Sequence, residues 1–165
     1  MIRPYDHAAA LLYAHRWAYR RNPLFYDYEE LGGDCTSFIS QCVLAGSGIM
    51  NYTPTFGWYY VDGNDKSPSW SGVPYFYNFM VRQQESIGPF AAPCTMEELL
   101  PGDVIQLSFD GLNYAHSLFV VATAFPLSPR RIFVATHSAD ADYRPLSSYG
   151  YQRARGIHFR GVRWP

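Results

Sequence analysis

The chain has 165 residues, enough for one domain with a substantial core, and 48% of them are hydrophobic against 16% charged. That balance excludes a disordered chain. Thirteen Lys and Arg face fourteen Asp and Glu, a net charge of −1. The basic residues are scattered, apart from a run at 153–163 that alternates with apolar residues. We therefore expect a single domain over 1–165, with neither nucleic acid nor a membrane as partner.

The three cysteines cannot all pair within the chain, so at least one free thiol is expected. A free thiol favours a reducing compartment or a catalytic cysteine. The start shows no signal peptide, and no apolar run approaches ~18 residues. The chain as given is therefore expected to be cytoplasmic, with a domain of a longer secreted or cell-wall protein as the alternative.

Helical signals dominate the first half of the chain. Apolar residues recur at helical spacing over 6–21, and Asn22-Pro23 ends that helix. An aromatic, acidic loop fills 24–33. A second, strongly apolar helix is predicted from 35 to 45, stopped by Gly46. The segment 46–75 is rich in Gly, Pro, Ser and Asn and is predicted to be a long loop.

Strand signals dominate the last third. A short helix is expected around 74–86 and a helical turn with a tight turn at 97–103. Alternation and β-branched residues then predict four strands, at 104–109, 116–125, 131–137 and 157–164. Helices followed by an antiparallel sheet define an α+β fold.

Cys35 is the most informative residue, because it follows Gly32-Gly33 and Asp34 at the head of the second helix. Asp34 can cap that helix, and a helix N-terminus lowers the pKa of a thiol. Cys42 lies two turns further along the same face and is expected in the core. Cys94 follows a proline in a loop. Cys35 is thus the expected nucleophile.

A cysteine nucleophile needs a base, and two of the five histidines lie at strand ends. His116 begins one predicted strand and His137 ends the next, so a hairpin would bring both to the same end of the sheet. A one-residue slip in register would place them on opposite faces. Asp140 and Asp142 follow His137 closely and are alternative groups to orient the base.

Another use of these three residues is a zinc site formed by Cys35, His116 and His137, although no local ligand pair supports it. Aromatic residues make up 18% of the chain, and many lie in loop-like sequence. Aromatic side chains in loops often line clefts or contact ligands. The alternative is that they fill the core of a loop-rich protein.

Several motifs together resemble the bacterial putative amidase domain family of the papain-like superfamily, which includes NlpC-type peptidases and CHAP amidases. They are Tyr5-Asp6-His7-Ala8-Ala9-Ala10, Gly33-Asp34-Cys35-Thr36-Ser37-Phe38-Ile39-Ser40-Gln41-Cys42, Trp58-Tyr59-Tyr60, Trp70, Leu100-Pro101-Gly102-Asp103-Val104-Ile105, His116-Ser117 and Thr136-His137-Ser138. The resemblance covers nearly the whole chain and keeps the expected order.

The resemblance implies a papain-like α+β fold with the nucleophile helix packed on an antiparallel sheet. It assigns Cys35 as nucleophile, His116 as general base and acid, and His137 as the third member that orients His116. It also places Asp34 and a tyrosine, either Tyr26 or Tyr28, beside the site. The aromatic middle supplies the further expected substrate contacts, which are Trp58, Tyr59 and Trp70.

The implied reaction is hydrolysis of an amide bond through a thioester, without a metal or organic cofactor. Relatives cleave amide bonds in peptidoglycan peptides, so a peptide or amide substrate is expected, with a cell-wall peptide as one candidate. Two alternatives use the same fold. One is an acyltransferase that passes the acyl group to an amine, and the other is a non-catalytic, aromatic-rich binding module.

Overall fold

The computed structural model describes residues 1–165. A seven-stranded antiparallel sheet forms its centre, in the order β1-β9-β5-β6-β7-β8, with β4 also paired to β9. The strands of this sheet are β1 Ile2–Arg3, β4 Gly88–Cys94, β5 Val104–Ser108, β6 Tyr114–Thr123, β7 Ile132–Thr136, β8 Ala141–Pro145 and β9 Arg153–Arg163. The α+β class with an antiparallel sheet is therefore confirmed.

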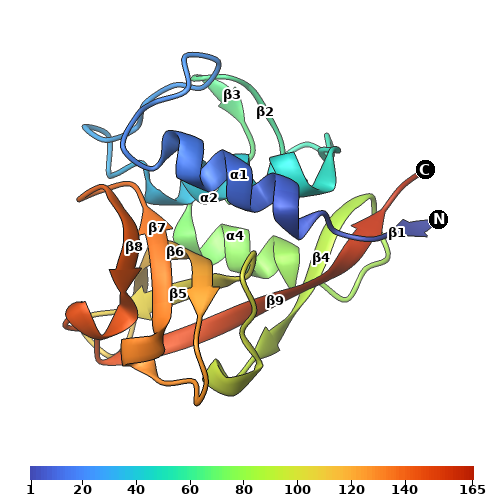
Figure 1. The fold of residues 1–165 in the computed structure, drawn as a ribbon. Helices are drawn as coiled ribbons and strands as arrows, with labels where there is room; N and C mark the ends of the chain where they lie inside the picture. The colour runs from blue at the N-terminus through green and yellow to red at the C-terminus, as the bar shows by residue number, and fades with distance from the viewer.

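The helices gather together, with β9 running across beneath them (Figure 1). They are α1 His7–Trp17, α2 Cys35–Ser47, α3 Pro68–Ser71 and α4 Val73–Met80, and three short 3-10 helices are η1 Met96–Glu98, η2 Pro129–Arg131 and η3 Leu146–Ser148. No helix is long and apolar enough to cross a bilayer. The two chain ends lie side by side because β1 pairs with the end of β9.

Two apolar clusters cover the two faces of the sheet. The larger joins α1, α2 and α4 to one face, and Phe38, Phe119 and Phe159 are buried within it. The smaller lies on the other face, where Leu118 and Val134 pack under the segments around η1 and η3. Side chains alternate along β6, so Phe119 and Val121 belong to the larger cluster and Leu118 and Val120 to the smaller.

The helix α2 is buried along most of its length, from Cys35 to Ser47. It runs two residues beyond its predicted last residue, 45, and passes through the predicted stop at Gly46. Gly48 ends it with a left-handed φ of 73°, which a glycine adopts at little cost. A Cβ on Gly46 would lie 2.6 Å from the Tyr5 ring, so this glycine allows close packing inside the helix rather than ending it.

Other boundaries differ from the sequence prediction. The first helix ends at Trp17, before residue 21, and the third predicted helix ends at Met80, before residue 86. The predicted loop 46–75 contains a small second sheet, β2 Tyr60–Asp62 with β3 Asp65–Lys66, and the helix α3. Strands β4 and β8 were not predicted, since β4 contains two prolines and Ala141–Pro145 lacks β-branched residues.

Candidate active site

Cys35 is the first residue of α2, and 7% of its surface is exposed. Its Sγ lies 3.7 Å from Thr36 Oγ1. Burial raises the pKa of the Cys35 thiol, and the backbone N–H of Ser117, directed at the sulfur, acts in the opposite direction without overcoming it. The backbone N–H of Thr36, in the first turn of α2, also acts to lower this pKa, as the sequence predicts for a helix N-terminus, but burial outweighs it and the net shift is upward.

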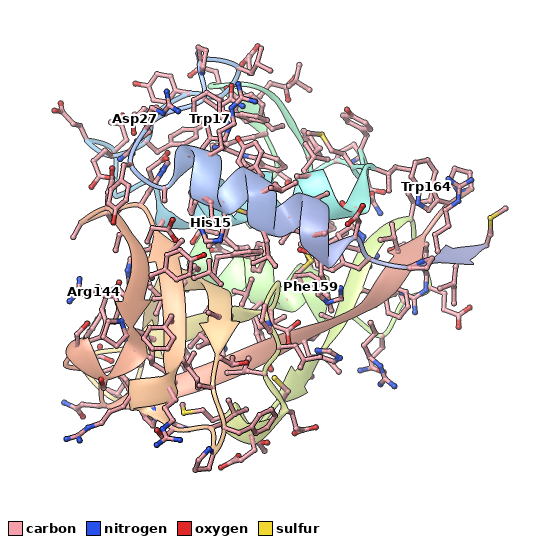
Figure 2. The ribbon with its side chains drawn as sticks, in the orientation of Figure 1. His15, Trp17, Asp27, Arg144, Phe159 and Trp164 are labelled. Atoms are coloured by element: carbon pink, nitrogen blue, oxygen red, sulfur yellow. The ribbon has the colours of Figure 1, made fainter.

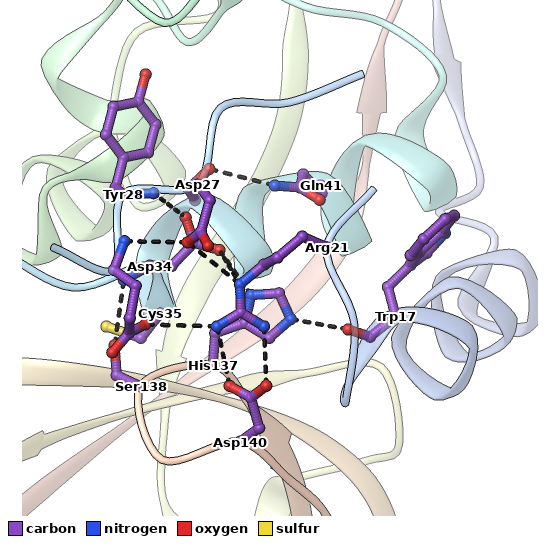
Figure 3. Close-up of polar contacts among 12 residues, drawn as sticks. Trp17, Arg21, Asp27, Tyr28, Asp34, Cys35, Gln41, His137, Ser138 and Asp140 are labelled. Atoms are coloured by element: carbon purple, nitrogen blue, oxygen red, sulfur yellow. Dashed lines mark hydrogen bonds and ion pairs between the residues drawn. The ribbon is translucent and has the colours of Figure 1, made fainter. Parts of the chain in front are cut away.

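Asp34 is the N-cap residue of α2, but its side chain makes no capping hydrogen bond, although the sequence indicated that it could. Its Oδ2 lies 2.6 Å from His137 Nδ1, and its Oδ1 accepts the backbone N–H of Tyr28 at 2.8 Å. Figure 3 shows the carboxylate turned away from the helix and toward the ring of His137. The first N–H groups of α2 have no acceptor within the helix, so they remain available beside the sulfur of Cys35.

Both ring nitrogens of His137 have acceptor partners. Nδ1 meets Asp34, and Nε2 lies 2.8 Å from the carbonyl oxygen of Trp17. A carbonyl oxygen can only accept, so Nε2 carries hydrogen, and one further proton lies between Nδ1 and the carboxylate. His137 and Asp34 thus form a hydrogen-bonded pair in which each side chain is 1% exposed.

Arg21 ties this pair to the neighbouring loops. Its guanidinium donates twice to Asp140, at 2.8 and 3.1 Å, and its Nε lies 3.2 Å from Asp27 and 3.7 Å from Asp34. Burial acts to lower the pKa of Arg21, but its bonds to Asp140 and Asp27 outweigh that effect and raise it. In Figure 2, Trp17 and Asp27 both lie toward the C-terminal end of α1.

His116 lies at the start of β6, next to the residue whose N–H points at Cys35. Its side chain follows the alternation of Leu118, which packs on the face away from α2. Its Nε2 has one long contact, 3.5 Å to Thr136 Oγ1. Burial, and then the charge of Arg144, lower the pKa of His116 to about 4, so its ring is a neutral base at neutral pH.

The structure does not assemble the predicted triad contacts. No hydrogen bond joins Cys35 to His116 or His137, and His137 contacts Asp34 and Trp17 rather than His116. Phe119 pairs with Ala135, and Thr136 Oγ1 donates to the Ser117 carbonyl at 3.0 Å. The two histidines lie at the same end of adjacent strands, as predicted. His137 falls one residue out of step with His116, so their side chains take opposite faces.

The two aspartates considered as alternative orienting groups are also engaged elsewhere. Asp140 pairs with Arg21, and Asp142 Oδ2 lies 2.8 Å from His15 Nδ1 on α1. No three His, Cys, Asp or Glu side chains converge as a metal site would require.

The predicted substrate contacts divide by burial. Trp58 and Trp70 are fully buried, with ring centroids 5.2 Å apart and ring planes tilted by 36°, so they are core residues and cannot touch a substrate in this conformation. Tyr28 is buried and donates its hydroxyl to the Gly63 carbonyl. Tyr26 is 48% exposed, Tyr59 is half-buried, and Asp34 is enclosed by its partners.

Arg21, Trp17 and Ser138 also belong to this region, and no sequence pattern singled them out. Ser138 Oγ accepts the backbone N–H of Asp34 at 3.1 Å, and its φ of 63° is left-handed. The Trp17 contact uses only a backbone carbonyl, which no side-chain pattern can reveal. Arg21 sits among scattered basic residues, and the cluster of acids at 27–34 was the signal that could have drawn attention to it.

The fold and this region define an α+β protein with a cysteine at the head of a buried helix and a histidine on each adjoining strand. The family model described as "Putative amidase domain" matches residues 4–160, so the chain belongs to that family. The family is named for hydrolases that act on the C–N bond of amides.

One similar protein is the "Uncharacterized protein YhbB" of Bacillus subtilis (strain 168), which is 31% identical over 121 residues. That match covers 72% of this chain and 37% of the relative, so the chain spans well under half of the relative's length. No solved structure matches the chain.

Proposed function

We propose that this chain is a papain-like cysteine amidase that hydrolyses an amide bond in a peptide substrate through a thioester on Cys35. The observation that carries the proposal is the orientation of Asp34. Its carboxylate bonds to His137 and Tyr28 instead of capping α2. The first-turn N–H groups of α2 are thereby left free next to the only cysteine at a helix start, which suits stabilisation of an oxyanion.

His116 is the proposed general base. Of the two nearby histidines, only His116 has a ring nitrogen without a strong partner, because both nitrogens of His137 are occupied. With its pKa lowered to about 4, His116 is neutral and able to accept a proton. Its ring lies on the opposite face of the sheet, so the start of β6 has to rearrange to bring it to the sulfur when substrate binds. Catalytic hydrogen bonds often tighten only in the complex.

In the proposed reaction, His116 takes the thiol proton as Cys35 Sγ attacks the amide carbonyl carbon. The first-turn N–H groups of α2 hold the oxyanion. The C–N bond then breaks, His116 protonates the leaving amine, and the thioester remains on Cys35. Water, deprotonated by His116, hydrolyses the thioester and restores the thiol. His137 takes the part of a positioning residue, since it acts on Cys35 only through Asp34.

The substrate class we propose is a peptide of the cell-wall type, on the resemblance to NlpC and CHAP enzymes. No metal or organic cofactor takes part in the steps above. An acyltransferase would share the steps up to the thioester. Product analysis with and without an added amine separates the two, because hydrolysis gives a free acid and transfer gives a new amide.

The test compares cysteine variants on peptidoglycan-derived peptides, with products followed by mass spectrometry. Cys35→Ala is expected to lower turnover by roughly a thousandfold or more, because the nucleophile is removed. Cys42→Ala, seven residues further along α2, is the matched control and is expected to keep turnover while losing some stability. Equal turnover by wild type and Cys35→Ala would overturn the proposal.

A further inference from the structure

A cleft of about 610 Å³ opens beside the segment that follows α2. Its walls are the loop 51–57, the helices α3 and α4, and the turn 82–86. Cys35 does not line it. No residue of α2 lines the cleft, and neither does His116 or His137. It is therefore separate from the candidate active site.

The cleft is held open by groups that already have their partners. Asn51 exchanges two backbone hydrogen bonds with Trp58, and its side chain donates to the Ile87 carbonyl at 2.9 Å. Ser69 Oγ donates to the Gly57 carbonyl at 2.6 Å. A Cβ on Gly57 would lie 2.2 Å from the Asn51 carbonyl oxygen, so this wall needs glycine. These bonds pre-form the site before any ligand arrives.

Arg82 is the one charged residue that lines the cleft, and its guanidinium is fully used. Its N–H groups donate to Ser86 Oγ and to the carbonyls of Phe79, Pro89, Ser86 and Ile87. Arg82 has no N–H group left to bind an anion, and no Asp or Glu lines the cleft to bind a cation. The ligand that fits is therefore uncharged.

Two aromatic side chains at the cleft are exposed rather than buried. Phe56 is 84% exposed and Tyr75 56% exposed. Phe56 follows Thr55, whose φ of 66° is a strained value for a β-branched residue. A strained backbone that presents a phenyl ring to solvent is a feature expected at a binding site.

The remaining polar side chains that line the cleft are uncharged and have no hydrogen-bond partner within the protein. The side chains of Thr53, Thr55, Asn78 and Gln84 and the hydroxyl of Tyr75 line the cleft and make no hydrogen bond within the protein. Amide and hydroxyl groups both donate and accept. They match a ligand that carries hydroxyl and amide groups along with an apolar face.

We propose that this cleft binds a short uncharged oligosaccharide bearing N-acetyl groups. The rings of Phe56 and Tyr75 would pack against the C–H faces of the sugar rings. Asn78 and Gln84 would form hydrogen bonds with the hydroxyl and acetamido groups. This binding does not depend on catalysis at Cys35.

The test is a titration of the full chain with tri-N-acetylchitotriose, followed by two-dimensional NMR and calorimetry. Phe56→Ala and Asn78→Ala are each expected to weaken binding by about tenfold, because each removes one recognition group. Leu112→Ala, which truncates an 83% exposed side chain outside the cleft, is the control and is expected to bind as wild type does. Cys35→Ala is also expected to bind normally, which keeps this result distinct from a failure of the amidase proposal.

Three results would overturn the proposal. They are no binding of the trisaccharide to wild type, binding that neither Phe56→Ala nor Asn78→Ala weakens, and equal binding of an uncharged tripeptide. Chemical shift changes confined to residues around Cys35 rather than 51–57 and 75–86 would equally place the ligand elsewhere.

Discussion

At the residue scale, the buried pair of Asp34 and His137 decides how Cys35 is presented. The pair fixes three parts of the chain at once, because Asp34 precedes Cys35, His137 follows β7, and the Nε2 of His137 holds the end of α1 through Trp17. The His137 ring also stacks on Phe38 of α2 at 4.0 Å between centroids. Removing either side chain leaves the other buried without this partner.

We therefore expect Asp34→Asn to lower the free energy of unfolding by about 3–5 kcal/mol, since it removes one partner of a fully buried pair. Urea unfolding followed by circular dichroism measures the loss. The double variant Asp34→Asn/His137→Gln is the control, because it replaces both partners of the pair. A loss in the double variant equal to the sum of the two single losses would show that the pair is not coupled.

His116 makes stability depend on pH in a defined direction. Its pKa is about 4 in the folded protein, lowered by burial and by Arg144, and ~6.5 in an unfolded chain. Between these values the unfolded state binds more protons, so stability falls as pH drops from ~6.5 toward 4. Above ~6.5 both states are neutral and the contribution is complete.

We expect the difference in unfolding free energy between wild type and His116→Gln to shift by about 3 kcal/mol from pH 7 to pH 4. Wild type loses this stability and the variant does not. Subtracting the two urea titrations at each pH cancels the other titrating groups, which both proteins share. A difference that stays constant over this range would contradict a buried, neutral His116.

At the element scale, α2 is positioned by glycines at both of its ends. Gly33 has φ of 101° and Gly48 has φ of 73°, conformations that L-residues with a side chain rarely adopt. A Cβ on Gly33 would lie 2.9 Å from Ser138 Oγ, the group that accepts the Asp34 N–H. A Cβ on Gly48 would meet only the Trp164 ring at 3.5 Å, an ordinary contact.

Gly33→Ala and Gly48→Ala are each expected to cost about 1 kcal/mol or more of stability, from the left-handed backbone. Only Gly33→Ala is also expected to change the rate at which iodoacetamide alkylates Cys35, because it displaces Ser138 and the start of α2. The rate is measured at alkaline pH, where the thiol with its raised pKa ionises. Identical alkylation rates in both variants would refute this difference.

At the scale of the whole molecule, β9 is the strand that connects parts of the sheet from different regions of the chain. It pairs with β1, β4 and β5, so it joins the start of the chain, the middle and the hairpins of the last third. Ile157, Phe159 and Val162 on this strand are buried in the larger cluster.

A chain that ends at residue 152 is therefore expected to lose its fixed tertiary structure, seen as loss of the near-ultraviolet circular dichroism of its aromatic residues. Removal of residues 1–3 is the control and is expected to preserve that signal, since β1 is short and pairs only with the end of β9. A native near-ultraviolet spectrum for the chain ending at residue 152 would show that β9 is dispensable.

The sequence predicted those parts of the fold that follow from local pattern. The periodicity of 35–45 identified α2, and alternation identified β5, β6, β7 and β9. It did not predict β4, because its prolines disfavour a strand and only the pairing with β9 makes it one. The candidate site shows the same division. The sequence predicted Cys35 at the start of a helix and the two histidines at the ends of strands. It could not predict the register of β6 and β7, which places His116 on the face away from α2 and His137 against Asp34.

The central claim is that Cys35 carries the acyl group, and peptide mass mapping after acid quenching during turnover of peptidoglycan-derived peptides tests it directly. We predict an acyl adduct on the peptide that contains Cys35, released by hydroxylamine, present in Cys42→Ala and absent from Cys35→Ala. Turnover that continues in Cys35→Ala, with no adduct on wild-type Cys35, would contradict the account.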